Sequence, residues 1–151
     1  MPNSVLRNLI ALALVLCFFA LPAGALERQV EYTNPAVGGK DSPSYWLDRG
    51  GLYATYGSYK AAVAAYTKAL ELDATLSQAH FDMGVAYGEI SDYDQALLHL
   101  NKAIEMSPDI AEYYYGRAWV LLLAGQRSRA LADFQKAADL GDPDAEDYLS
   151  K

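Results

Sequence analysis

Residues 77–109 of this chain read SQAHFDMGVAYGEISDYDQALLHLNKAIEMSPD. Apolar residues recur at helical spacing on both sides of Ser91-Asp92, a dipeptide typical of a turn. The stretch therefore predicts two short amphipathic helices, at about 77–90 and 93–106, joined by a tight turn.

The same arrangement of small residues appears once earlier and once later in the chain. Gly50, Gly84 and Ala118 stand 34 residues apart. A second series follows the same step: Ala62, Ala96 and Ala130. A fixed period of this length predicts a helical solenoid, in which each two-helix unit buries its apolar face by stacking on its neighbours. The period places the other helices at about 43–56, 59–72, 111–124 and 127–140.

Residues at fixed offsets within each unit match the pattern of a known repeat. The three sets are His80-x2-Met83-Gly84-x2-Tyr87 with Ala96-x3-Leu100, Trp46-x2-Arg49-Gly50-x2-Tyr53 with Ala62-x3-Tyr66, and Tyr114-x2-Arg117-Ala118-x2-Leu121 with Ala130-x3-Phe134. This pattern resembles the tetratricopeptide repeat over residues 43 to about 142. Arg49 and Arg117 depart from it, because that family usually has leucine there.

The resemblance implies an all-α fold, a right-handed α-solenoid of three helix-turn-helix units at 43–76, 77–110 and 111–142. We expect residues 143–151 to form a C-terminal capping helix. Pro143 suits the first turn of a helix, and a solenoid needs a polar outer face at its end.

Small residues at the crossing of two helices give the repeated ladder a physical reason. Helix axes lie about 8–10 Å apart, at a distance set by the residues in contact, so glycine or alanine there lets the helices approach. Aromatic residues of the first helices are expected to pack beside them. The predicted packing set is Trp46, Gly50, Tyr53, Ala62, Gly84, Tyr87, Ala96, Ala118 and Ala130.

The first 25 residues predict a secretory signal rather than part of the fold. Arg7 precedes the apolar run 9–21, which is shorter than the roughly 20 residues of a membrane-spanning helix. Small residues after Pro22 predict cleavage, with Ala23 and Ala25 at the recognition positions. The protein is therefore expected to be exported, either periplasmic or secreted. The alternative is an uncleaved segment that anchors the chain to a membrane.

Composition narrows the partners of the chain that remains after cleavage. Loss of Arg7 leaves 11 basic against 19 acidic residues, a net charge of −8, which argues against nucleic acid and anionic membranes as partners. The only cysteine, Cys17, leaves with the signal, so we expect no disulfide. Residues 26–42, which include Pro35 and a glycine pair, predict an extended or disordered linker.

In the tetratricopeptide family the first helices of successive units line a concave groove, and the resemblance implies the same surface here. If Trp46, Gly50 and Tyr53 face the stack, helical geometry turns neighbouring residues toward that groove. Stepping by the repeat length predicts an apolar and aromatic groove with an acidic edge, formed by Leu47, Asp48, Phe81, Asp82, Val85, Glu89, Tyr115, Trp119 and Leu122.

The sequence thus favours a non-catalytic protein-binding module of the cell envelope. Its ligand is expected to be a peptide or protein segment with apolar anchors, with or without a basic residue. Phe81, Tyr115 and Trp119 are the expected hot spots. Some family members bind a peptide carboxylate, but Asp48 and Asp82 would repel one here.

Other interpretations stay open at this point. The repeats could be a scaffold or assembly subunit of a larger envelope complex. The apolar helix at 113–124 could instead be covered by a second copy of the chain or by its own residues 26–42. An enzyme is a remote alternative, because His80 takes a packing position and His99 lies on a face left to solvent. No catalytic residue, metal site or cofactor is predicted.

Overall fold

The fold is an array of helices in a computed structural model that describes residues 42–151. The predicted signal, with Ala23 and Ala25, and all but the last residue of the predicted linker lie outside these residues. The described helices are α3 (Pro43–Thr55), α4 (Tyr59–Leu72), α5 (Ser77–Glu89), α6 (Tyr93–Met106), α7 (Ala111–Leu123), α8 (Arg127–Asp139) and α9 (Pro143–Leu149). None of them is both long and apolar enough to cross a membrane.

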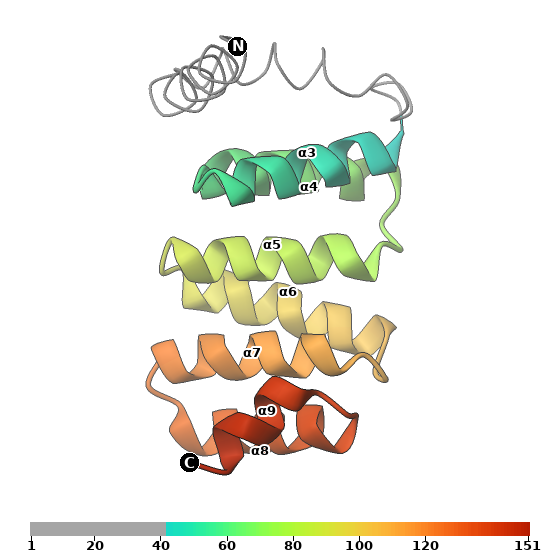
Figure 1. Cartoon of the computed structure of the whole chain (residues 1–151). Helices are drawn as coiled ribbons and strands as arrows, with labels where there is room; N and C mark the ends of the chain where they lie inside the picture. The colour runs from blue at the N-terminus through green and yellow to red at the C-terminus, as the bar shows by residue number, and fades with distance from the viewer. Residues whose placement is uncertain (1–41) are drawn as a thin grey trace, which may run out of the picture. The chain divides into compact units, whose positions relative to one another are not determined.

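Three helical hairpins follow one another along the array, formed by α3 with α4, α5 with α6, and α7 with α8 (Figure 1). Helix α4 then packs on α5, and α6 on α7, so each unit rests on the next. The first helices α5 and α7 also contact each other directly. The predicted class, an all-α solenoid of three helix-turn-helix units with a cap, is confirmed.

Glycines allow close contact between the two helices of the first and second units. A Cβ added to Gly50 would lie 2.3 Å from Cε1 of Tyr66, and one added to Gly84 would lie 2.7 Å from Cγ of Leu100. Both distances are shorter than van der Waals contact, so the ring and the leucine occupy the space that the glycines leave. Of the predicted packing set, Trp46 and Tyr87 are half-buried and the other residues are buried.

Each hairpin turn depends on one residue with left-handed backbone geometry. These residues are again 34 apart, with φ of 71° at Gly57, 64° at Ser91 and 76° at Gly125. At the second turn the Ser91 amide donates to the Gly88 carbonyl and the Asp92 amide donates to the Tyr87 carbonyl, both at 2.9 Å. This pair of bonds is a Schellman motif, which satisfies the last carbonyls of the helix.

Arg117 joins three helices and explains one departure from the leucine usual in the repeat. Its Nε and Nη2 atoms each donate to an oxygen of Asp133 on α8 at 2.7 Å, and its Nη1 donates to Oδ1 of Asn101 on α6 at 2.7 Å. A forked pair of this kind fixes side-chain orientation as well as charge. The second and third units are therefore linked by a largely buried polar network.

Arg49 shows a different solution at the corresponding position of the first unit. Its guanidinium lies between 5.5 and 5.8 Å from the ring centroids of Tyr45, Trp46 and Tyr53. It also donates to the hydroxyls of Tyr45 at 2.7 Å and Tyr53 at 3.1 and 3.2 Å. Cation–π attraction and these bonds explain how the charged group is held while buried.

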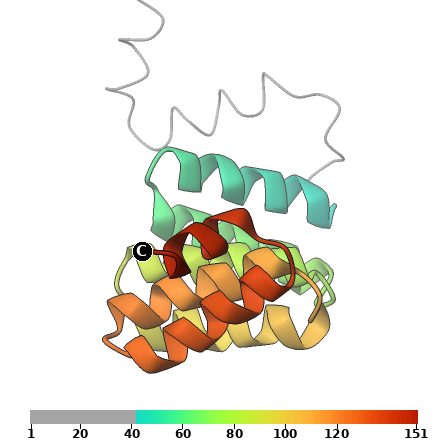
Figure 2. The same ribbon diagram turned by 60° about the horizontal axis from the view of Figure 1, so that its bottom comes forward.

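The last helix, α9, closes the end of the array beside α8 (Figure 2). Its N-cap residue Asp142 accepts a hydrogen bond from the amide of Ala145 at 2.8 Å. Ala145 is fully buried, and the Tyr148 ring stacks on Phe134 with centroids 4.1 Å apart. Exposed acidic residues in its first turn, Asp144 and Glu146, give α9 the polar outer face that a terminal cap requires.

Candidate functional site

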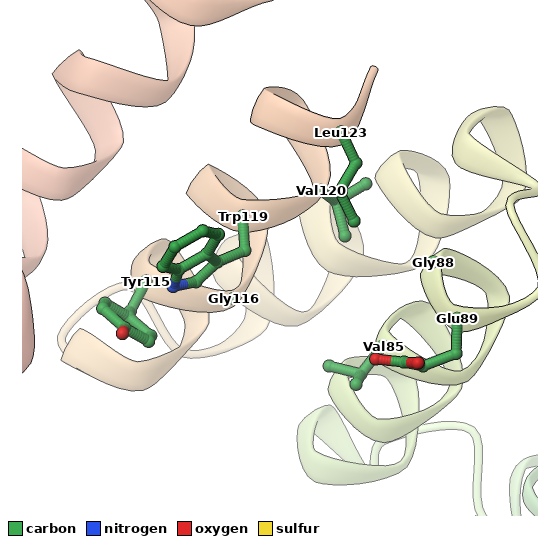
Figure 3. A pocket seen from close by; sticks show the side chains of 8 residues that line it. All are labelled: Val85, Gly88, Glu89, Tyr115, Gly116, Trp119, Val120 and Leu123. Carbon is green, nitrogen blue, oxygen red and sulfur yellow. The ribbon is translucent and has the colours of Figure 1, made fainter. Parts of the chain in front are cut away.

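A groove of about 240 Å³ lies between the first helices of the second and third units, where α5 and α7 run side by side (Figure 3). Helix α5 supplies Val85, Gly88 and Glu89, and helix α7 supplies Tyr115, Gly116, Trp119, Val120 and Leu123. The lining is mainly apolar and open to solvent. A concave apolar surface with few polar groups is the usual form of a ligand site.

Two glycines form part of the groove and allow close packing below it. A Cβ on Gly116 would lie 2.6 Å from Cε2 of Phe81, and one on Gly88 would lie 3.0 Å from Cγ2 of Val120. A larger residue at Gly116 would therefore have to displace the Phe81 ring. The floor of the groove is set by this contact between neighbouring units.

Aromatic rings make a supported wall on the α7 side of the groove. The Trp119 side chain is 41% exposed, yet its ring meets Tyr115, Phe134 and Tyr148 edge to face, with centroids 5.6 to 6.2 Å apart. Such T-shaped pairs are favourable beyond their buried area. The orientation of the indole is thus fixed by its contacts with three other rings.

Glu89 is the one charged residue among the eight described residues that line the groove. Its negative charge raises the pKa of the Tyr59 hydroxyl on α4. The ion pairs found within residues 42–151 do not include Glu89. The groove therefore carries negative charge and no cation.

Asp82 lies outside the lining of this groove. Burial is the largest cause that raises its pKa, to about 6, and the charge of Glu112 acts in the same direction. A hydrogen bond from Nε2 of Gln78, 3.0 Å from Oδ1 of Asp82, opposes the rise. The carboxyl group is consequently held where its charge is costly.

The structure brings four of the predicted groove residues together and separates the others. Val85, Glu89, Tyr115 and Trp119 line one groove. Four others are not among its lining residues: Leu47, Asp48, Asp82 and Leu122.

Phe81 corrects the expectation of an exposed hot spot. Its side chain is only 7% exposed, and its ring stacks on Tyr113 with centroids 4.8 Å apart. The absence of a side chain at Gly116 makes room for the ring beneath the groove surface.

Four further residues complete the lining: Gly88 and Gly116, which the repeat step relates to Leu122 and Asp82, and the residues Val120 and Leu123. The register of the repeat placed residue 122 in the groove, whereas α7 presents the stripe that runs through Gly116, Val120 and Leu123. This stripe has a spacing of three and four, so helical periodicity is its only signal in the sequence. The rotation of α7 against α5 decides which stripe faces the groove.

The two histidines meet between α5 and α6, away from the groove. Their Nδ1 atoms lie 3.0 Å apart, and the His99 ring also stacks on Tyr87 with centroids 5.6 Å apart. His99 was expected to face solvent, but it is half-buried between His80 and Tyr87. Burial lowers the pKa of both rings. Within residues 42–151 no three His, Cys, Asp or Glu side chains gather as a metal site would require.

Comparison with known families finds two overlapping matches. A family model described as "Tetratricopeptide repeat" matches residues 81–145, and one described as "TPR repeat" matches residues 50–91. No curated protein matches the chain in sequence.

Several solved structures share the arrangement of helices. YrrB, described as "a TPR protein with an unusual peptide-binding site", is 26% identical with a TM-score of 0.62. The match covers 69% of this chain and 54% of YrrB, so this chain matches about half the length of YrrB. The Arabidopsis OM64 TPR domain is 21% identical with a TM-score of 0.67, covering 75% of this chain and 98% of that domain.

A further match is the second TPR of Spaghetti (RPAP3), solved with the HSP90 peptide SRMEEVD. It is 23% identical with a TM-score of 0.63, covering 67% of this chain and 94% of that one. The likenesses to OM64 and RPAP3 show the fold alone.

Proposed function

Because this chain belongs to the tetratricopeptide repeat family, we propose that it is a non-catalytic module that binds a peptide or protein segment in the groove between α5 and α7. Binding of peptides and assembly of proteins are the roles that TPR domains commonly serve. The ligand would lie along the groove as an extended or helical segment with apolar anchors.

One observation carries this proposal, the exposed apolar surface of the groove. Trp119 and Leu123 are 41% and 59% exposed, although each sits next to side chains that are well packed. Large side chains that stay exposed beside a concave surface mark an interaction site. The peptide-binding site attributed to YrrB, a relative of the same fold, supports the choice of a peptide or protein ligand.

The experiment compares two exposed leucines that differ only in location. Leu123 lines the groove, whereas Leu98 lies on α6 outside it, and both are 59% exposed. Partners captured from the native source by the wild-type chain should be lost with Leu123→Asp and retained with Leu98→Asp. A partner retained equally by both variants would move the binding site away from the groove.

We also propose that the module acts outside the cytoplasm, in the periplasm or as a secreted protein. The support is the order of Arg7, the apolar run 9–21 and the small residues that end at Ala25. Mass spectrometry of the protein from its native source should find a chain that begins at Leu26. A native chain that retains residues 1–25 would favour the anchored alternative.

A further inference from the structure

The groove is bordered by one acidic side chain, Glu89, and by the aromatic rings of Tyr115 and Trp119, and this combination favours a cationic ligand group. Figure 3 shows Val85 and Glu89 on α5 directed toward α7, whose Val120 and Leu123 face them, while the Tyr115 and Trp119 rings extend from the outer side of α7 at the rim of the groove. Among the described residues that line the groove, Glu89 alone carries a charge. An indole face and a carboxylate both attract cations, and no lining cation competes for them.

The charge on Glu89 is available to a ligand. Among the described residues it acts on the neutral hydroxyl of Tyr59, whose pKa it raises, and the ion pairs found there do not include Glu89. An ionised carboxylate offers about four acceptor positions on its two oxygens, so most of them stay open to a further donor. Glu89 is also an exposed residue at the end of α5, where a ligand can reach it.

We propose that the groove selects segments in which an arginine lies next to an apolar side chain, and that Glu89 is the residue that determines this specificity. The apolar side chain would contact Val85, Val120 and Leu123, while the guanidinium would pair with the Glu89 carboxylate at the rim of the groove, which the Trp119 indole also borders. This inference rests on the proposed function of the groove as a peptide-binding site.

Arginine fits this site better than lysine. Its planar guanidinium stacks on an aromatic ring and presents forked N–H donors to a carboxylate, whereas an ammonium is a compact and strongly hydrated charge. Acidic segments are rejected by the same residue, because a ligand carboxylate beside Glu89 would meet a like charge with no lining cation to offset it. The net charge of −7 on the whole chain adds to this preference at long range.

A phage-displayed library of random dodecapeptides tests the inference with the full-length chain. Parallel selections would use the wild type, Glu89→Gln, Glu89→Lys and the control Glu105→Gln, which removes an exposed acid on α6 outside the groove. Arginine beside an apolar residue should be enriched with the wild type and the control. The enrichment should disappear with Glu89→Gln, and acidic residues should replace arginine with Glu89→Lys.

A synthetic peptide from the wild-type selection gives the quantitative readout. Replacing its arginine by glutamine should weaken binding to the wild type about threefold to tenfold, since ion pairs and cation–π contacts in open sites are modest. The same replacement should leave binding to Glu89→Gln almost unchanged.

The outcomes separate this inference from the function on which it rests. Two results would overturn the role of Glu89 and leave groove binding intact, provided that the selected peptides no longer bind Leu123→Asp. Either the peptides selected by the wild type show no preference for arginine, or the peptides selected by Glu89→Gln show the same preference. Recovery of no peptide that depends on Leu123 would overturn both.

Discussion

The Nδ1 atoms of His80 and His99 lie 3.0 Å apart, so the pair forms a hydrogen bond only while at least one ring is neutral. Burial lowers the pKa of both rings, and the positive charge of Lys102 lowers them further. His80 is affected by His99 as well. The contact between α5 and α6 at this point therefore depends on pH.

Acid should weaken the fold through this pair. The folded pKa of each histidine lies below its unfolded value near 6.5, so the unfolded chain binds more protons as the pH falls through that value. The stability that the neutral pair contributes is complete above pH 6.5 and declines below it. Urea unfolding at pH 7.5 and at pH 5.5 gives the free energy of unfolding at each pH. The decrease in this free energy between pH 7.5 and pH 5.5 should be smaller for His99→Gln than for the wild type. An equal loss in both proteins would contradict the prediction.

Asp82 should have the opposite pH dependence. Its folded pKa of about 6 is above the ordinary value of 3.8, so the charged carboxylate costs stability at neutral pH. That cost disappears as the pH falls from about 6 toward 4. Asp82→Asn should raise the free energy of unfolding by about 1–2 kcal/mol at pH 7.5, after allowance for partial solvent exposure. It should have little effect at pH 4. Lower pH weakens the fold through the histidine pair and strengthens it through Asp82. The comparison of His99→Gln with its parent protein is therefore best made with Asp82→Asn present in both.

Adding a methyl group should change stability in opposite directions at two glycines on the first helices of neighbouring units, Gly84 and Gly51. Gly84→Ala places its Cβ against Leu100 and the carbonyl oxygen of Ala96, at 2.7 and 3.0 Å, and should cost about 1–3 kcal/mol. Gly51→Ala meets no atom within 4 Å, so better helix propensity should stabilise it by about 0.5–1 kcal/mol. Thermal unfolding of both variants gives the comparison. A neutral Gly84→Ala would mean that the hairpin tolerates wider spacing.

Ser91 should gain from becoming glycine. It alone among the non-glycine residues at 42–151 has a left-handed backbone, at the position that Gly57 and Gly125 take in the other units. Left-handed geometry costs a residue with a Cβ about 1 kcal/mol. Ser91→Gly should therefore raise the unfolding free energy by roughly that amount, and Gly57→Ser should lower it similarly. Chemical denaturation of the two variants measures the change in the free energy of unfolding for each. A destabilised Ser91→Gly would be evidence against backbone strain at Ser91.

The Arg117–Asp133 pair should show strong coupling. Arg117→Leu restores the residue usual in the repeat but leaves the buried Asp133 without its forked partner, which should cost about 3–5 kcal/mol. Replacing both residues by leucine should recover much of that loss. A double-mutant cycle by urea unfolding tests this, and simple additivity of the two single changes would contradict it.

The array of helices was predictable because its signals are local and repeated. The step that relates Gly50 to Gly84 fixes the unit, and positive-φ turns follow at the same step. The groove was only partly predictable, because its surface depends on how α7 rotates against α5. The repeat pattern assigns both Phe81 and Trp119 to the groove face, yet the glycine at 116 lets the Phe81 ring sink into the interior while the Trp119 ring stays outside.

The same limit applies to the polar contacts. Arg117 stood out in the sequence only as a departure from leucine. Its partners Asn101 and Asp133 come from two other helices, and no spacing within one unit joins the three residues. His99 was predicted to face solvent because the repeat usually leaves that face of the second helix exposed. Its contacts with His80 and Tyr87 bury it partly instead.

Tyr148 gives the end of the chain a second role. Its ring buttresses Trp119 and Phe134 from α9, three residues before the last residue, Lys151. Trimming the final turn would therefore loosen the indole at the rim of the groove as well as fray the array. A change in the packing of α9 would thus reach the groove through a single ring.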